Sequence, residues 1–414
     1  MNIGPVMFLQ THLIRPRNLK QMRNIAKEGQ LFVAFVERSQ SVSSDIPEGL
    51  FQKVYKLTMD VPESKRFFKR VIASFSMQSF FNDAMCEVNP KCIQVEGLDC
   101  LYFAFRFIKK NPSTLLVYQV SDVRESLLPQ KGLLNTIRGR FIANFEAYLL
   151  KRASILVVTS EQFFERRYRR YFSDDRLVVW HNYPDPVLFE AVSHVPSDEF
   201  RVVFVGSIRY QRQLRNLVDA VSGINDCKAI FSGAGKKREY DALVSYCEGK
   251  PWTSITGPYD YDTEIVSIYS NADCIFAVYD ATNENVKIAL PNKLYEAVFC
   301  GLPILVAQGT YLEQLVLDWG VGLSVPCDDS TALRDVIKEL KENRELRETI
   351  SKNCAVAKQK ILSETPKNDY IRALVYGVHW LLSLFLPGMC IMLSRLLFSI
   401  IILNQQVVGF TLYF

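Results

Sequence analysis

One carboxylate, Glu296, stands in a pattern suited to binding the ribose of a nucleotide. It lies one turn into a predicted helix that begins near Pro291, within PNKLYEAVFCGLPI (291–304). A carboxylate there can accept hydrogen bonds from both ribose hydroxyls, and water competes poorly with that arrangement in a cleft. The alternative is that Glu296 only stabilises the helix dipole, which is worth less than about 1 kcal/mol. The surrounding pattern favours the binding site.

The elements around Glu296 are expected to present helix ends to a ligand. Gly301 should end the first helix, and Pro303 opens an apolar run, ILVA, that is typical of a buried strand. A Gly-Thr turn then starts a second helix, TYLEQLVLDWG (310–320). In α/β folds such helix N-termini face the carboxyl ends of parallel strands, where phosphorylated ligands bind.

A second candidate carboxylate, Asp122, lies in the first half of the chain. It follows the apolar run TLLVYQV (114–120), so we expect it at a strand end that faces a cleft. There it could hold an acceptor hydroxyl or a sugar hydroxyl; the alternative is that it caps the next turn. No single residue of the chain has the features of a general base.

Apolar strand-like runs alternate with amphipathic helical runs along most of the chain, which predicts parallel sheets covered by helices on both faces. In the first half, strands are expected at 31–37, 53–59, 91–96, 114–120, 154–160 and 176–182. After a polar linker (183–200), strands are expected at 200–207, 228–233, 253–256, 274–279 and 304–307. We therefore predict an α/β protein with two Rossmann-like domains, 1–190 and 198–362, that face each other across a cleft.

Composition excludes several classes of protein. The chain has 414 residues and a net charge of +5, which argues against a dedicated nucleic-acid binder. Its ten cysteines include no C-x-x-C pair, and its four histidines show no metal-ligand spacing. The N-terminus lacks the pattern of a secretory signal. We expect a protein of the reducing cytoplasm without a metal site.

The end of the chain predicts contact with a membrane. Ala373–Ser394 contains no charged residue, and residues 381–414 are mostly apolar. Residues 363–380 are expected to form a helix that crosses back to the first domain. Two basic-aromatic stretches, KRFFKR (65–70) and FFERRYRRYF (163–172), favour an anionic membrane surface. Nucleic acid or a solvated basic helix would be the other interpretations.

Four motifs of the second half occur in the order that one enzyme family uses: FVGSIRYQRQLRNLVDAV, FSGAGKKREYDALV, GPYDYDTEIVSIYSNADCIFAVY and LPNKLYEAVFCGLPILV. This half resembles the C-terminal domain of the retaining GT-B-fold glycosyltransferases of family 4 (glycosyl transferases group 1). The resemblance covers about residues 200–345 and is weaker over 115–185. It implies a nucleotide-sugar donor site in the second domain.

The resemblance also implies which residues hold the donor. An Arg and a Lys of the family bind the diphosphate from the loop after the domain's first strand, which here reads GSIRYQRQLR. Arg209 and Arg212 are the candidates, with Arg215 behind them, although the usual Lys-Gly pair is absent. Gly206 and Ser207 would lie beside the donor, since glycine lets the backbone approach a ligand closely.

One position departs from the family pattern. Many members carry a second Glu eight positions before the ribose-binding one, and here that position is Ile288. In its place, backbone amides of residues 283–291 and the Lys293 ammonium could hold sugar or phosphate. Thr310 and Tyr311, at the start of the next helix, could bind phosphate through backbone N–H groups.

The function expected from this resemblance is the transfer of a hexosyl group from a nucleotide-diphosphate sugar to a hydroxyl acceptor, with retention and without metal or other cofactor. The membrane-facing features favour a lipid-linked glycan acceptor of bacterial surface polysaccharide synthesis, at the inner face of the cell membrane. Two alternatives stay open. One is a non-catalytic nucleotide-sugar-binding subunit of a membrane glycan assembly complex, and the other is a nucleotide-sugar epimerase.

Overall fold

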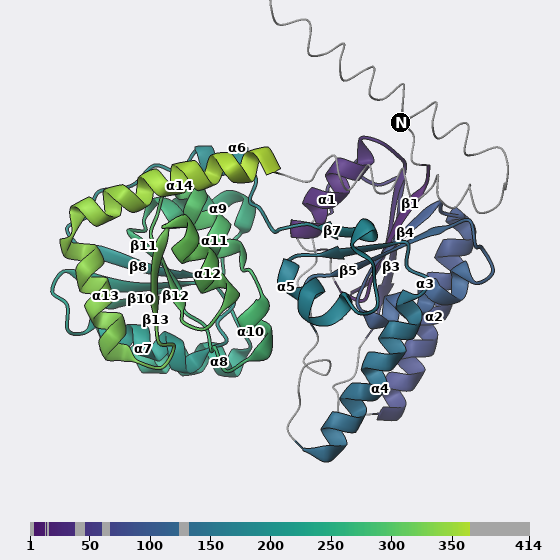
Figure 1. Ribbon diagram of the computed structural model, residues 1–414, viewed down its shortest axis with the longest axis horizontal. Coiled ribbons are helices and arrows are strands. Elements are labelled where there is room, and N and C mark those ends of the chain that lie inside the picture. The colour runs from purple at the N-terminus through teal and green to yellow at the C-terminus, as the bar shows by residue number, and fades with distance from the viewer. Residues whose placement is uncertain are drawn as a thin grey trace, which may run out of the picture.

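The computed structural model describes residues 4–12, 14, 16–37, 46–59, 67–123 and 132–364. These residues form two α/β domains that lie side by side, each built on one parallel sheet (Figure 1). Within the described residues, the chain passes from the first domain to the second through residues 183–199, which include the short helix α6 (Pro186–Glu190). The predicted fold class, with two Rossmann-like domains, is confirmed.

The first domain contains a seven-stranded sheet in the order β3-β2-β1-β4-β5-β6-β7. Its strands are β1 (Val6–Gln10), β2 (Leu31–Glu37), β3 (Lys53–Thr58), β4 (Cys92–Glu96), β5 (Leu115–Val120), β6 (Ile155–Val158) and β7 (Leu177–Val179). Its helices are α1 (Pro16–Ala26), α2 (Phe67–Val88), α3 (Leu98–Ile108), α4 (Leu133–Leu150) and α5 (Glu161–Phe163), followed by the π-helical turn η2 (Phe164–Tyr168) and the 3₁₀ turn η3 (Asp174–Arg176). All six strands expected from the sequence are present.

One interior strand of this sheet, β1, is the one that sequence patterns missed. It pairs in parallel with β2 on one side and with β4 on the other, and all five of its residues are buried. Its segment, VMFLQ, is short and stands close to the start of the chain. A run of that length has too little periodicity to be assigned by itself.

The second domain contains a six-stranded sheet in the order β10-β9-β8-β11-β12-β13. Its strands are β8 (Phe200–Val205), β9 (Cys227–Ser232), β10 (Thr253–Gly257), β11 (Cys274–Ala277), β12 (Ile304–Ala307) and β13 (Gly322–Val325). Its helices are α7 (Gln211–Val221), α8 (Lys237–Cys247), α9 (Tyr261–Ser270), α10 (Glu284–Ile288), α11 (Asn292–Cys300), α12 (Tyr311–Trp319), α13 (Ser330–Glu342) and α14 (Arg344–Glu364). Sequence patterns missed the edge strand β13 among these strands and the short helix α10, whose residues were expected to form a loop.

In both sheets the strand order reverses beside the first strand of the domain, between β1 and β4 and between β8 and β11. Ligands of doubly wound sheets bind outside the carboxyl ends of the strands at this reversal. The helix that precedes β12 ends as expected, because Gly301 adopts the left-handed conformation (φ 69°). The fold therefore directs a ligand toward the ends of β8 and β11.

The last described helix, α14, packs against α11 and α13 of its own domain. The expected crossing helix (363–380), beyond Glu364, and the apolar tail (381–414) lie outside the described residues. In the part of the chain that the structure covers, no helix is long and apolar enough to cross a membrane.

The structure corrects the interpretation of residues 163–172. Four of the five aromatic residues face the core of the first domain, because helical spacing places them on one side: Phe163, Phe164, Tyr168 and Phe172. Arg167 is also buried, and it donates a hydrogen bond to Glu146 at 3.0 Å. The aromatic residues are therefore mainly a packing element, whereas three of the four arginines, Arg166, Arg169 and Arg170, are exposed. In KRFFKR, residues 65 and 66 lie outside the described residues and the other four begin α2.

Candidate functional site

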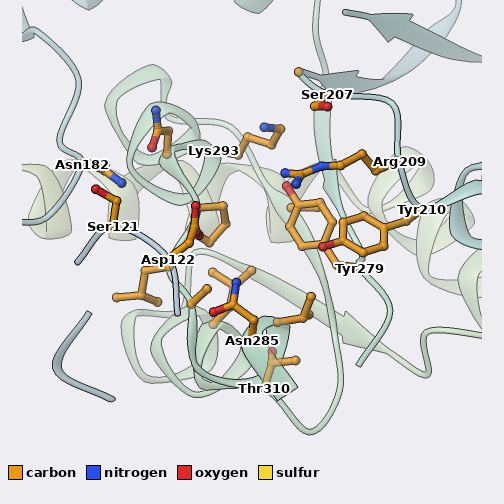
Figure 2. A pocket seen from close by; sticks show the side chains of 18 of the residues that line it. Ser121, Asp122, Asn182, Ser207, Arg209, Tyr210, Tyr279, Asn285, Lys293 and Thr310 are labelled. Carbon is orange, nitrogen blue, oxygen red and sulfur yellow. The ribbon is translucent and has the colours of Figure 1, made fainter. Parts of the chain in front are cut away.

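A pocket of about 520 Å³ lies between the two domains, at the carboxyl ends of β8 and β11 (Figure 2). The first domain contributes the residues that follow β5 and β7, and the second contributes the loop after β8 and the N-terminal ends of α11 and α12. The polar and charged lining consists of Ser121, Asp122, Asn182, Ser207, Arg209, Tyr210, Tyr259, Tyr261, Tyr279, Asn285, Asn292, Lys293, Glu296 and Thr310. Seven of the nine predicted site residues line this pocket.

Gly206 brings the end of β8 close to the start of α11. Its φ is 116°, a backbone conformation that residues other than glycine rarely adopt. A Cβ atom built on Gly206 would lie 2.9 Å from the Nζ atom of Lys293. The ammonium group therefore occupies space that only a glycine leaves open, directly beside the strand end where a phosphate would bind.

Lys293 is the principal cation of the pocket. It stands in the first turn of α11, and within the described residues no carboxylate forms an ion pair with it. Burial lowers the pKa of Lys293, Glu296 opposes this effect, and the positive charge of Arg209 adds to it. An anion bound in the pocket would supply the negative charge to pair with this ammonium.

The three candidate arginines after β8, one in the loop and two on α7, point in different directions. Arg209 is exposed and lines the pocket on the same side as Lys293 (Figure 2). Arg212 lies outside the pocket lining and forms an ion pair with Asp328 at 3.2 Å. Arg215 lies over the ring of Tyr246. Arg212 was predicted beside Arg209 at the diphosphate, but it is already on α7, whose direction turns it away from the cleft.

Glu296 is buried, with 3% of its surface exposed, and two tyrosines hold its carboxylate. The hydroxyl of Tyr261 donates to Oε1 at 2.9 Å and that of Tyr269 donates to Oε2 at 2.6 Å. Burial raises the pKa of both tyrosines, with a further contribution from Glu296, so both hydroxyls stay protonated as donors. Each carboxylate oxygen keeps a second lone pair for a ligand. The tyrosines are 35 and 27 positions away in sequence, and no local pattern pointed to them.

Thr310 and Tyr311 differ in their placement. Thr310 lines the pocket, but its hydroxyl accepts from the Glu313 N–H at 3.1 Å and donates to the Ala307 carbonyl at 2.8 Å. This hydroxyl is therefore occupied in capping α12, and only backbone N–H groups remain for a ligand. Tyr311 does not line the pocket, because its hydroxyl donates across the domain boundary to Glu161 at 3.3 Å.

The first domain forms the opposite wall of the pocket. Asp122 and Asn182 extend into it, facing Lys293 and Arg209 (Figure 2). The exposed Asp122 is the second residue after β5, at the end of a buried strand as expected from the sequence. The next residue fixes the wall to the second domain, since the Val123 N–H donates to Oδ1 of Asn285 at 3.2 Å.

Ile288, at the position where many family members carry a glutamate, does not line the pocket. Its side chain is 3% exposed and belongs to the hydrophobic core cluster of the first domain. Its carbonyl accepts a hydrogen bond from the hydroxyl of Ser160 at 2.7 Å. The residue therefore forms an apolar contact between the domains, and a donor sugar in the pocket would not reach it.

A polar network joins the domains beside this contact. His181, which follows β7, places Nε2 2.9 Å from Glu161 and Nδ1 3.1 Å from the hydroxyl of Tyr295. Tyr295 precedes Glu296 on α11, and its ring lies edge-on against that of Tyr183, with 4.7 Å between ring centroids. The network thus attaches α11, which carries Lys293, to the first domain.

Comparison with known proteins identifies the fold. The fold is similar to that of sucrose-phosphate synthase from Thermosynechococcus elongatus, with a TM-score of 0.67 and 15% identity over 92% of this chain and 99% of that one. Anabaena Alr3699/HepE in complex with UDP and glucose gives a TM-score of 0.66 and 15% identity over 90% and 99%. With its two facing Rossmann-like domains, the protein has the GT-B fold.

The second domain matches a known family. Residues 189–355 match the family model described as "Glycosyl transferases group 1". The match lies in the part of the chain whose motifs resemble that family. The succinoglycan biosynthesis protein ExoL of Rhizobium meliloti (strain 1021) is 22% identical over 266 residues, which make up 61% of this chain. The matched region spans 65% of ExoL, slightly less than two thirds of its length.

Proposed function

We propose that the protein transfers a hexosyl group from a nucleotide-diphosphate sugar to a hydroxyl acceptor, with retention of configuration. The observation that carries this proposal is the pairing of Lys293 with Gly206 at the reversal of the second sheet. A cation without an ion-pair partner there, beside the N-terminal turn of α11, suits a diphosphate. Glu296, held from behind by two tyrosines, suits the ribose hydroxyls.

The transfer itself requires stabilisation of a leaving diphosphate. The bond between the anomeric carbon and the diphosphate oxygen breaks, and the acceptor oxygen bonds to that carbon on the same face. The acceptor proton passes to the leaving phosphate oxygen, so no separate base is needed. Arg209 and Lys293 supply positive charge where negative charge develops, which supports a reaction without metal. Asp122, on the opposite wall, would orient the acceptor or the sugar through a hydroxyl.

The acceptor we propose is a lipid-linked glycan of bacterial surface polysaccharide synthesis, with the enzyme at the inner face of the cell membrane. ExoL, named for succinoglycan biosynthesis, supports the polysaccharide context. HepE, whose complex holds UDP and glucose, makes UDP-sugars the first donors to test.

The two alternatives differ in what the pocket must contain. An epimerase would use a set of acid-base groups, but the described lining has only two carboxylates, Asp122 and Glu296, and no histidine. A non-catalytic subunit would bind the nucleotide sugar and never turn it over.

Calorimetric titration with UDP, GDP and their sugars tests the donor site. One nucleotide should bind, and Glu296→Ala should weaken it at least ten-fold, whereas the exposed Glu339→Ala on α13 should not change it. If no nucleotide binds to the folded protein, the donor assignment fails. Binding with no release of nucleoside diphosphate to any glycan acceptor would favour the non-catalytic subunit.

A further inference from the structure

Helix α4 carries a stripe of large apolar side chains on its outer face. Ile137, Phe141 and Tyr148 are 56%, 73% and 52% exposed. Their spacing of four and seven residues places them within roughly 40° of one another around the helix axis. Single exposed apolar residues are ordinary, but an aligned set of three on one helix marks a contact surface.

Helix α3 extends this stripe into a broader surface. The rings of Phe105 and Tyr148 have centroids 5.4 Å apart, and those of Tyr102 and Phe145 are 5.8 Å apart. These contacts hold α3 and α4 together, so their outer sides form one continuous face, here called the α3–α4 face. Figure 1 shows α4 projecting beyond the sheet of the first domain.

Basic side chains surround the apolar stripe. Arg140 lies on α4, Arg106 lies on α3, Lys109 caps the C-terminal end of α3, and all three are exposed. Lys151 and Arg152, also exposed, follow α4 directly.

Few acidic side chains offset this positive charge: Asp99, in the first turn of α3, is exposed, and α4 has no exposed carboxylate between residues 133 and 152. The only carboxylate between residues 133 and 152 is Glu146, which is buried and accepts hydrogen bonds from Arg167, Tyr118 and Tyr168. This carboxylate is neutralised inside the domain, so it does not offset the positive charge outside.

We propose that the α3–α4 face docks on an anionic lipid surface. A helix with aligned apolar residues and flanking cations inserts its apolar side at the headgroup boundary while the cations bind lipid phosphates. A second copy of the chain fits this face poorly, since a symmetric contact would oppose two basic surfaces. A nucleic acid would leave Ile137 and Phe141 without an apolar partner.

This inference deepens the membrane part of the proposed function and rests on it for its biological meaning. Vesicle binding is measured without donor or acceptor, so its failure would be distinguishable from failure of the transfer reaction. The apolar tail is a second possible source of membrane affinity. Every variant below keeps the tail, so any change in binding belongs to the α3–α4 face.

The test is co-sedimentation of the full chain with vesicles of phosphatidylcholine alone or mixed with phosphatidylglycerol. The test variant is Arg140→Glu/Phe141→Ser. Its matched control is Lys352→Glu/Val356→Ser, which makes the same kind of change on the exposed face of α14 in the second domain. All four side chains are exposed, so thermal unfolding should be unchanged in both.

Removing one basic residue near the headgroups should weaken binding roughly five-fold, the equivalent of about 1 kcal/mol. The test variant also reverses a charge and loses an aromatic ring, so we expect binding to anionic vesicles at least ten-fold weaker, with the control unchanged. Wild-type affinity in the test variant would overturn the proposal. Equal binding of the wild type to neutral vesicles, or a change of molecular mass caused by the test variant in light scattering, would also overturn it.

Discussion

The environment of Lys293 should affect the protonation of its ammonium group in opposite directions in the free and the ligand-bound protein. Burial beside Gly206 disfavours the charged ammonium, whereas a bound diphosphate would favour it. The lowered pKa of Lys293 is thus what we expect of a buried lysine whose anionic partner is a ligand.

This conflict predicts two pH dependences of opposite sign. Between the lowered pKa of Lys293 and its ordinary value of 10.5, the unfolded chain binds more protons than the folded one. The free energy of unfolding should therefore rise with pH in that window, while nucleotide affinity falls as the ammonium loses its proton. Calorimetry and chemical unfolding from pH 7 to 10 measure both. Lys293→Met should abolish both trends, and their persistence in that variant would exclude Lys293 as the titrating group.

The arginines of the loop after β8 give a direct comparison between two neighbouring side chains. Arg209→Ala should lower kcat/KM for the donor by about 10- to 100-fold, since it removes positive charge from the developing diphosphate. Arg212→Ala should change it less than two-fold, because Arg212 already pairs with Asp328 at the surface. Steady-state rates of nucleoside diphosphate release decide the matter. Equal losses would mean that Arg212 reaches the ligand after all.

Glu296 predicts how the protein distinguishes ribose from deoxyribose. If both carboxylate oxygens accept from the ribose, UDP should bind at least ten-fold more tightly than 2′-deoxy-UDP. Glu296→Ala should erase this preference, and Tyr269→Phe should reduce it, because Oε2 would lose its fixed position. Competition titrations give the ratio for each variant. A preference that survives in Glu296→Ala would assign the ribose to another residue.

How much of the site can be predicted from the sequence depends on how far apart along the chain the contacting residues lie. Glu296, Lys293 and Gly206 belong to local motifs, and the structure places all of them at one pocket. The choice between Arg209 and Arg212 depends on where the loop ends and α7 begins, and three arginines spaced three residues apart do not reveal that point. Tyr269 approaches Glu296 only through the packing of α9 on α11, which no spacing in the sequence encodes.

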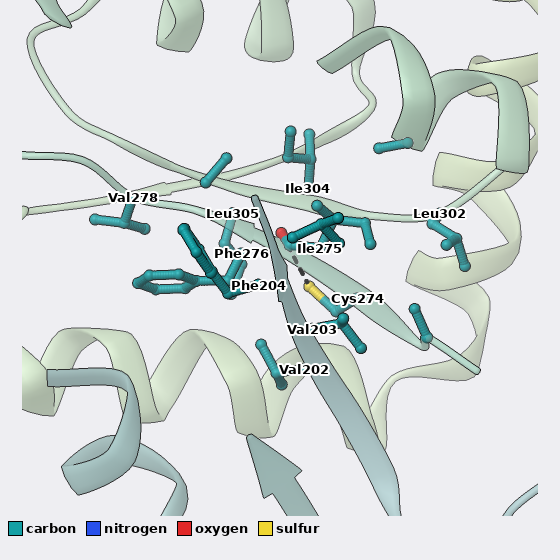
Figure 3. Packing of buried hydrophobic residues seen from close by; sticks show 14 of the residues in the cluster. Val202, Val203, Phe204, Cys274, Ile275, Phe276, Val278, Leu302, Ile304 and Leu305 are labelled. Atoms are coloured by element: carbon teal, nitrogen blue, oxygen red, sulfur yellow. Dashed lines mark hydrogen bonds between the residues drawn. The ribbon is translucent and has the colours of Figure 1, made fainter. Parts of the chain in front are cut away.

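At the scale of elements, the second domain depends on the packing between β8, β11 and β12. Val203, Ile275, Phe276 and Leu305 interlock there beneath the strand ends that carry the pocket (Figure 3). All four are almost completely buried. Continuous apolar strands of this kind were readily predicted, whereas β13, with the segment GLSV, carries glycine and serine and gives little strand signal.

Truncating this core should be costly to stability. Phe276→Ala removes a ring that is completely buried, so we expect the free energy of unfolding to fall by about 3–5 kcal/mol. The exposed Val356→Ala on α14 should change it by less than about 0.5 kcal/mol. Denaturant titration followed by tryptophan fluorescence compares the two. A loss below about 1 kcal/mol for Phe276→Ala would contradict the packing described.

At the scale of the molecule, the two domains are joined by more than the linker. Ile288 from α10 packs into the core of the first domain, and the network of His181, Glu161 and Tyr295 lies beside it. The isoleucine at position 288, where many family members carry glutamate, therefore has a structural role, because its side chain packs between the two domains.

Restoring the family residue here should harm the protein. Ile288→Glu would bury a carboxylate in an apolar cluster without a cation, so either the domains separate or stability falls by several kcal/mol. Ile288→Leu keeps the volume and should cost less than about 1.5 kcal/mol. Small-angle scattering and thermal unfolding distinguish separation from destabilisation. A gain in transfer activity in Ile288→Glu would instead show that this position reaches the donor sugar.

Ile288 also limits how the two halves of this protein can be recombined. An engineer who joins its second domain to another first domain would cut within residues 183–199, where the described part of the chain passes from one domain to the other. The cut would separate Ile288 from the apolar surface that receives it, although both halves would keep intact sheets. A working hybrid would need a matching apolar recess in the new first domain, or a different residue at position 288.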